Sequence, residues 1–319
     1  MDQQILSSRA IRGMYFARLE QNPGLAWVNA VSNLFDSDQA SENYAFLGQS
    51  PTFREWLGDR NAKGLRSSAF EIRNKHYEST LEIAVRDARR DKTGQISARV
   101  NEWVDRSLSH WASLLSTLLI NGATTVCYDG QYYFDTDHSE GDSGSQSNSI
   151  TVDISNMPTQ THGASAAAPS VEEMQYMMLS GISQILGFKD DQGEPMNENA
   201  TQFTVLVPTS YAFTALQAVS GIPTANSAVA NLNPNVLANF TVNAAVNPRL
   251  NTWTDKIAIF RSDSPIKGLI RQQETAVDLK VKAEGSEFEF DNDAWQFGID
   301  AWRGAGYGYG QRACLVTLV

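Results

Sequence analysis

Cysteine and long apolar runs are both scarce in this sequence. Its 319 residues include two cysteines, Cys127 and Cys314, which excludes a disulfide-built scaffold and a zinc site made of cysteines. The longest apolar run, Leu114–Ile120, is interrupted by Ser116 and Thr117 and is far shorter than the roughly 20 residues that a membrane-spanning helix needs. No basic segment followed by an apolar one opens the chain. We therefore expect no signal peptide, no membrane partner, and synthesis in a reducing cytoplasm.

Basic residues are also in the minority. The chain has 25 Lys and Arg against 36 Asp and Glu, a net charge of −11, which argues against a dedicated nucleic-acid binder. The segment 54–92 departs from this balance, with ten basic against seven acidic residues. Such a mixed-charge segment would suit docking on the acidic surface of a second copy, although a solvated hairpin accounts for the charges equally well.

Common catalytic motifs are missing as well. The sequence contains no GxSxG, Walker loop, HExxH or CxxC, and its four histidines are scattered. Neither cysteine has a histidine beside it in the sequence, so we interpret both as buried, inert thiols. These absences favour a protein that is not an enzyme and needs no cofactor.

One polar cluster keeps a catalytic alternative open. Asp135, Asp137 and His138 fall within four residues, and two carboxylates with an imidazole can bind a divalent ion. A metal-dependent hydrolase built on these three residues is therefore an alternative hypothesis. Asp and His also favour turns, and the cluster opens a polar loop. For this reason we predict no catalytic residue and no metal ligand.

Apolar periodicity predicts the main helices. Residues 95–121 carry apolar side chains at three- and four-residue steps, and 27 residues of helix span roughly 40 Å, which is typical of a structural strut. Helices are predicted over 171–186 and 209–219, on either side of a strand at 203–208 that we expect to be fully buried. This helix–strand–helix order predicts an α/β lobe.

The remaining segments are predicted as an arm, strands and loops. The first 40 residues have weak helical spacing at 5–19 and 25–35 and resemble an arm that cannot bury its apolar side alone. Residues 225–248 are rich in Asn and Ala and are interpreted as a surface segment. Alternation of apolar and polar residues predicts strands at 70–85, 127–134, 255–260, 266–274, 277–283, 288–290, 294–302 and 314–319. Alternate glycines at 304–310 predict a close backbone approach.

An aromatic-rich excursion precedes the first of these strands. Tyr44, Phe46, Phe53 and Trp56 lie among glycines, a proline and charges, without a period of 2 or 3.6. Long excursions with aromatic anchors usually serve binding rather than a private core.

Several ordered strings carry a resemblance to a known family. The chain resembles the major capsid proteins of tailed phages, which have the Hong Kong-97-type fold, and it is most similar to the Mu-like major head subunit, the gpT family. The strings are Tyr44, Leu47-Gly48-Gln49, Pro51, Arg54-Glu55-Trp56, Gly58-Asp59-Arg60, Lys63-Gly64-Leu65, Cys127-Tyr128-Asp129-Gly130-Gln131, Phe134-Asp135-Thr136-Asp137-His138, Pro265-Ile266-Lys267, Phe297-Gly298-Ile299-Asp300-Ala301 and the AGYGYG stretch near the end.

The resemblance implies an α+β capsid fold in five parts. These are an N-terminal arm (1–40), an extended E-loop (41–92), the spine helix of a peripheral domain (93–123), an axial α/β domain (124–265) and the peripheral-domain strands (266–319).

It also implies a function and a set of partners. The chain would assemble into hexamers and pentamers that form an icosahedral shell around phage double-stranded DNA, and its location would be the virion capsid, after synthesis in the bacterial cytoplasm. Partners would be copies of itself, portal, scaffold or decoration proteins, and packaged DNA through weak, sequence-independent contacts. An encapsulin-like nanocompartment shell is the alternative with the same fold.

Contacts between subunits are expected from the aromatic and basic residues of the E-loop, since such residues anchor obligate interfaces. Some capsid proteins of this fold cross-link an E-loop lysine to a neighbour, and Lys63 and Lys75 lie in that region, but no motif selects either. The predicted contact residues are Phe53, Arg54, Trp56, Arg60, Lys63 and Arg66.

Overall fold

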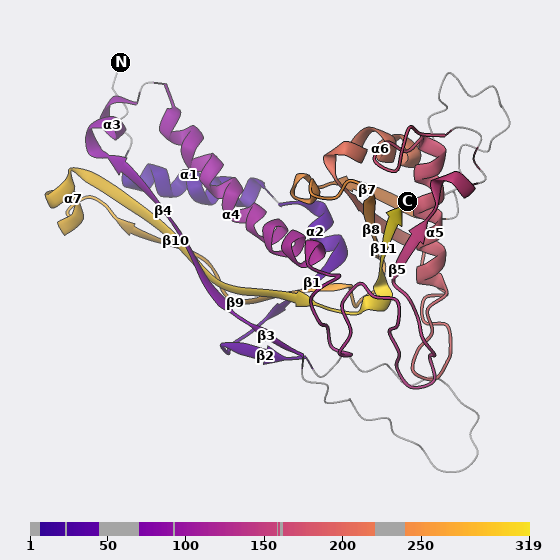
Figure 1. Ribbon diagram of the computed structural model, residues 1–319. Helices are drawn as coiled ribbons and strands as arrows, with labels where there is room; N and C mark the ends of the chain where they lie inside the picture. The colour runs from indigo at the N-terminus through magenta and orange to yellow at the C-terminus, as the bar shows by residue number, and fades with distance from the viewer. Residues whose placement is uncertain are drawn as a thin grey trace, which may run out of the picture.

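The described residues form a four-stranded sheet, a five-stranded sheet and a small two-stranded sheet, and the first two lie end to end (Figure 1). The computed structural model describes residues 7–22, 24–44, 70–91, 93–157, 159, 162–220 and 240–319.

The first sheet is long and narrow. Its four strands have the order β1-β9-β10-β4, in which β1 runs parallel to β9 and the other neighbours are antiparallel. The two 14-residue strands β9 and β10 form a hairpin that carries the short helix α7 near its tip (Figure 1). The bounds are β1 Ser32–Asp36, β4 Lys75–Ala84, β9 Leu269–Lys282, α7 Glu287–Asn292 and β10 Ala294–Tyr307.

One face of this sheet is covered by α4, Gln95–Ile120. Alternate side chains of the strands, such as Phe297 and Ile299, pack with Val100 and Val104 of the helix in one buried cluster. Helix α1, Ser8–Gln21, lies on α4 and adds Ile11 and Tyr15 to the cluster.

An ion pair fixes α1 against α4. The Arg18 guanidinium donates from Nε and Nη2 to the two carboxylate oxygens of Asp105, at 2.9 and 2.7 Å. The first helix of the predicted arm thus packs on its own chain. The short helices α2, Ala26–Val31, and α3, Val85–Arg90, complete this part of the molecule.

A two-stranded sheet crosses β10 at its glycines. Strands β2, Ser41–Asn43, and β3, Glu71–Arg73, pair antiparallel. A Cβ at Gly304 would lie 2.7 Å from the carbonyl oxygen of Arg73, and one at Gly306 would lie 2.5 Å from Cδ1 of Ile72. The glycine ladder therefore permits the close approach that the sequence predicts.

The second sheet forms a compact lobe with two helices. Its order is β5-β11-β8-β6-β7, and α5 and α6 pack on it around fully buried side chains such as Met177, Phe203 and Ile259. The bounds are β5 Ser149–Val152, α5 Val171–Leu186, β6 Gln202–Val207, α6 Ala212–Ser220, β7 Thr241–Val246, β8 Lys256–Arg261 and β11 Ala313–Leu318. Short 3-10 turns cover Ile154–Asn156, Thr209–Tyr211, Pro248–Leu250 and Gly310–Arg312.

A third cluster of buried side chains holds the two parts together. It contains Trp27 of α2, Leu115 of α4, Tyr133, Phe260 of β8 and Tyr307 of β10. Tyr133 and Tyr307 stack with ring centroids 4.5 Å apart. The junction is therefore packed as a core.

Helices α4 and α5 and strands β4, β6 and β8 confirm the predictions from periodicity. The predicted helix at 209–219 forms as a 3-10 turn followed by α6. None of the helices that the structure describes is both long and apolar enough to cross a membrane.

Four predictions of local structure were wrong. Residues 32–36 form β1 rather than continuing a helix, and 241–246 form β7 within the predicted surface segment. Residues 127–134 form turns rather than a strand, because their backbone groups bond locally, as Gly130 N does to Cys127 O. The predicted strand at 288–290 lies inside α7, whose Ser286 cap accepts from Glu289 N. The strand predicted at 314–319 forms as β11, which pairs with β8 and β5 in the second sheet.

Candidate functional site

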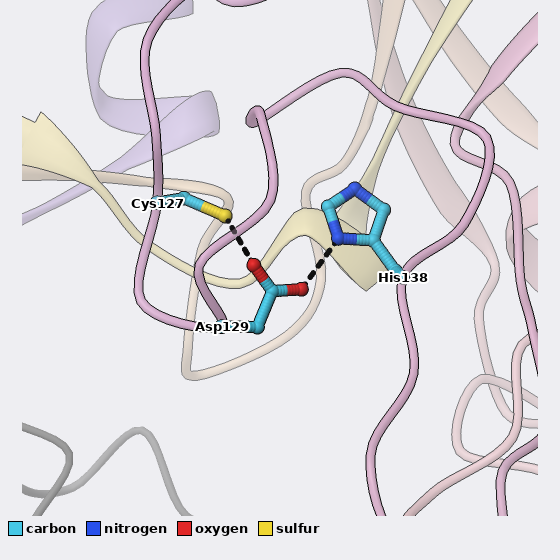
Figure 2. A group of neighbouring side chains, drawn as sticks. All are labelled: Cys127, Asp129 and His138. Atoms are coloured by element: carbon cyan, nitrogen blue, oxygen red, sulfur yellow. Dashed lines mark hydrogen bonds and ion pairs between the residues drawn. The ribbon is translucent and has the colours of Figure 1, made fainter.

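A buried triad of Cys127, Asp129 and His138 lies in the loops that follow α4 (Figure 2). The Cys127 thiol donates to Oδ1 of Asp129, with 3.0 Å between sulfur and oxygen. The imidazole Nδ1 of His138 lies 2.6 Å from Oδ2 of the same carboxylate. Figure 2 shows the carboxylate between the other two side chains. One carboxylate thus joins two loop segments that are 11 residues apart in sequence.

Asn148 ties these loops to the junction between the two sheets. Its side-chain amide donates to the carbonyls of Tyr133 and Gly310, at 2.7 and 3.2 Å, and its oxygen accepts from Asp135 N at 2.9 Å. The Tyr133 hydroxyl in turn donates to the carbonyl of Gly268, at 2.7 Å. The triad therefore belongs to a network that spans from the end of α4 to β9 and the turn before β11.

The electrostatics of the triad favour a charged pair. Burial alone would lower the pKa of His138, but the hydrogen bond and charge of Asp129 outweigh burial and raise it. Burial alone would raise the pKa of Asp129, but His138 and the Cys127 hydrogen bond lower it. Both changes stabilise a buried imidazolium–carboxylate pair.

The Cys127 thiol is not activated by this arrangement. Burial, followed by the hydrogen bond and charge of Asp129, strongly raises its pKa. Burial does the same to Cys314. A thiol reacts as its thiolate, so both cysteines stay protonated near neutral pH and supply no nucleophile.

The triad is the group of possible metal ligands that the described residues bring together, with its ligand atoms within 4.8 Å of one another. A thiophilic divalent ion would fit that set of donors only by displacing the protons that now link them.

Sequence reasoning missed Cys127 and Asp129 as partners of His138. The string Cys127–Gln131, which already carried the family resemblance, was the signal that could have found them.

The three residues of the alternative hydrolase hypothesis, Asp135, Asp137 and His138, are not brought together as a group of possible metal ligands. Asp135 accepts from the backbone N–H groups of Tyr132 and Thr136, and Asp137 accepts from the side chain of Gln131 at 3.4 Å. Two of the three proposed hydrolase residues therefore serve the turn itself, as short acidic side chains commonly do.

The predicted contact residues Phe53, Arg54, Trp56, Arg60, Lys63 and Arg66 all lie outside the described residues. Of the two lysines considered for cross-linking, Lys63 also lies outside them, and Lys75 is exposed at the start of β4.

Large apolar side chains are exposed at both ends of the described structure. Phe290 of α7 is 91% exposed, and Phe213 and Leu216 of α6 are 78% and 51% exposed. Figure 1 shows α7 at the tip of the long hairpin and α6 on the far lobe. Exposed apolar groups of this size are typical of interaction surfaces when they gather on one element, as on α6.

Comparison with solved structures identifies the fold as that of phage capsid proteins, the Hong Kong-97-type α+β fold. A chain of the bacteriophage JBD30 procapsid matches over 97% of this chain and 74% of its own length, with a TM-score of 0.53 and 19% identity. A capsid chain of cyanophage P-SCSP1u matches over 93% of this chain and 88% of its own, with a TM-score of 0.55 and 11% identity.

Sequence comparison finds a matching family model and two relatives, each over part of the chain. The model of the Mu-like prophage major head subunit gpT matches residues 10–168. The Mu-like prophage FluMu major head subunit of Haemophilus influenzae is 34% identical over 137 residues, and the major capsid protein of Escherichia phage Mu is 34% identical over 111. These matches cover 43% and 34% of this chain, and 44% and 36% of the relatives. They confirm the resemblance to the Mu-like major head subunit family, and the matched chains are head or capsid proteins rather than enzymes.

Proposed function

We propose that this chain is a major capsid protein that assembles into hexamers and pentamers of an icosahedral phage head. The observation that carries the proposal is the agreement of two independent comparisons. The gpT family model matches residues 10–168, and the likeness to a JBD30 procapsid chain extends over 97% of this chain. The elongated shape, with exposed apolar groups at both ends, supports a role in which neighbours cover those groups.

The parts of the fold are proposed as follows. Residues 1–40 are the N-terminal arm, 41–92 the E-loop and 93–123 the spine helix, which corresponds to α4. Residues 124–265 are the axial domain and 266–319 the peripheral strands. Because β11 pairs within the five-stranded sheet, we assign residues 313–318 to the axial domain as well.

Subunit contacts are proposed for Phe53, Arg54, Trp56, Arg60, Lys63 and Arg66 of the E-loop. We expect Trp56→Ala to reduce the yield of assembled particles much more than it lowers the melting temperature of the subunit. Trp302→Ala is the matched control, since Trp302 stacks on His76 of its own chain, with 4.7 Å between ring centroids. Normal particle yield from Trp56→Ala, seen by electron microscopy, would contradict the assignment.

Further partners follow from the same proposal. Portal, scaffold or decoration proteins would bind the shell, which is assembled in the bacterial cytoplasm and ends in the virion. The chain's net charge of −11 supports weak, sequence-independent contact with the packaged double-stranded DNA, because each phosphate neutralised by a basic residue would strengthen the grip on the genome.

A nanocompartment shell is the second candidate. A chain described as a virus-like particle from Pyrococcus furiosus matches over 97% of this chain and 98% of its own, with a TM-score of 0.51 and 10% identity. The sequence matches to head subunits of Mu and FluMu favour the phage head over this alternative.

Assembly of the purified protein tests the proposal. We expect sedimentation velocity and negative-stain electron microscopy to show hexamer-scale species or closed shells. Particles isolated from lysed host cells should contain DNA that is protected from added nuclease until the shell is disrupted. A protein cargo without DNA would favour the nanocompartment. A monomer at all concentrations would contradict both.

A further inference from the structure

Two arginines are buried against one tryptophan between the long sheet and its helix. Arg303 of β10 and Arg271 of β9 are 3% and 7% exposed. Their guanidinium carbons lie 4.6 and 5.6 Å from the ring centroid of Trp111, on α4. Contact with an indole ring stabilises a cation, but it does not neutralise its charge.

The charge of Arg303 has no partner in the described part of the molecule. No described carboxylate forms an ion pair with Arg303, and its buried Nε has no hydrogen-bond acceptor. Arg271 also has a buried Nε without an acceptor and forms no ion pair with a described carboxylate, but it donates from Nη2 to Oδ1 of Asn29 at 2.8 Å. Burying a guanidinium without a counter-charge costs desolvation free energy. A carboxylate that paired with Arg303 in the assembled protein would offset that cost.

Arg303 lines a cavity of about 270 Å³ between α4 and strands β4 and β10. Tyr77, Ser107 and His110 line the same cavity. Arg106 lies at its mouth, with a side chain that is 77% exposed and bonded to Glu102. The cavity therefore reaches solvent on one side and a buried cation on the other.

The cavity lining also carries two carboxylates, neither of which forms an ion pair with Arg303, although Oδ1 of Asp300 is buried without a hydrogen-bond partner. The Asp300 carboxylate bonds Lys280 at 2.9 Å and His76 at 3.3 Å, and Glu78 accepts from the Thr80 hydroxyl. Burial, then the charges of Arg303 and Arg249, lower the pKa of His110 to about 4. Near neutral pH His110 therefore adds no charge to the lining, in which Arg303 is a buried cation without an ion-pair partner among the described residues.

We propose that this cavity is an anion-binding pocket in which Arg303 receives a carboxylate side chain from a second copy of the chain. A planar guanidinium binds a carboxylate through two parallel hydrogen bonds. The chain supplies such ligands in excess, with 36 acidic against 25 basic residues. The inference rests on the proposed assembly into shells and adds one specific contact to it.

A matched pair of variants tests the proposal. Arg303→Met removes the charge that lines the cavity, whereas Arg271→Met removes the neighbouring buried charge, which does not line it. We expect Arg303→Met to lower the yield of particles at least tenfold without lowering the subunit's melting temperature. We expect Arg271→Met to change the yield less than twofold. Wild-type yield from Arg303→Met, or equal losses of yield in both variants, would overturn the proposal.

Two further readouts identify the occupant. A high-resolution map of wild-type particles should show a carboxylate of a neighbouring copy within hydrogen-bond distance of the Arg303 guanidinium. A carboxylate of the same copy there, or an empty pocket, would overturn the proposal. Binding of a free anion in the pocket would also overturn the proposal. Inorganic phosphate is the probe: it would then raise the melting temperature of the isolated wild-type subunit but not that of Arg303→Met. Failure of the wild-type chain to assemble would instead refute the proposed function itself, and the contact with it.

Discussion

The compact lobe and the long sheet of this molecule differ in how completely they bury their own apolar and charged side chains. In the lobe, α5 and α6 close over the five-stranded sheet, and Met177, Phe203 and Ile259 have no exposed surface. In the long sheet, the hairpin ends at a phenylalanine that is 91% exposed, and Arg303 is buried without a counter-charge among the described residues. The lobe completes its own core and leaves only the outer face of α6 open, with Phe213 and Leu216 exposed. The long sheet leaves both an exposed phenylalanine and a buried, unpaired cation.

The largest contrast should appear when one phenylalanine is truncated in each region. Phe203→Ala in β6 should cost about 3–5 kcal/mol of unfolding free energy, because it opens a cavity in a closed core. Phe290→Ala in α7 should change it by less than about 0.5 kcal/mol and yet reduce particle yield. Denaturant unfolding of the unassembled subunit measures the change in unfolding free energy for both variants. Equal changes for Phe203→Ala and Phe290→Ala would contradict the difference between the two regions.

Removing one member of the buried ion pair at the junction should have the next largest effect. His138→Gln leaves the Asp129 carboxylate buried beside a neutral group, and we expect a loss of about 3 kcal/mol in unfolding free energy. His162→Gln is the control, because the His162 side chain is 55% exposed and should contribute little. A cost for His138→Gln no greater than that of the control would show that the pair does not stabilise the junction.

The same pair predicts how stability depends on pH. Since the pKa of His138 is raised from 6.5, its contribution is fully present below pH 6.5 and is lost as pH rises through the raised pKa. Since the pKa of Asp129 is lowered from 3.8, its contribution is present above pH 3.8 and is lost as pH falls through the lowered pKa. Melting temperatures from pH 4 to 9 should therefore decline on the alkaline side. The decline should flatten in His138→Gln, and an unchanged pH profile would count against the pair.

The smallest expected effect is at the start of α5 in the lobe. The Ser170 hydroxyl accepts from Glu173 N, and Glu173 accepts from Ser170 N, which forms a complete capping box. Ser170→Ala should cost about 1 kcal/mol, whereas Ser180→Ala, inside the same helix, should cost nothing because alanine favours helix. Equal values for the two variants in chemical unfolding would show that the cap is dispensable.

Periodicity predicted the elements whose burial repeats along the chain. The apolar steps of α4 and the apolar run of β6 were both readable from sequence, because each element buries one face or both faces completely. The alternation in residues 288–290 predicted a strand. The segment instead lies in helix α7, which the Ser286 side chain caps at its start and a left-handed Asp293, at φ 47°, ends. β1 and β7 were missed because partners distant in sequence stabilise them.

The sites were less predictable than the fold. The sequence analysis grouped His138 with its sequence neighbours Asp135 and Asp137. These two carboxylates instead accept hydrogen bonds within the turn. Its actual partner, Asp129, approaches because the chain reverses between them. The sequence could not predict that Arg303 lacks an ion-pair partner among the described residues, because this depends on where the folded chain places each carboxylate.

Hydrogen–deuterium exchange of the subunit, before and after assembly, tests the contrast between the two regions most directly. The account predicts that β6, β8 and the buried part of α5 are already protected in the unassembled subunit and change little. It predicts that α7 and the exposed face of α6 gain protection only in particles. Full protection of α7 in a lone subunit, or no gain on assembly, would contradict the claim that copies of the chain cover what the long sheet leaves open.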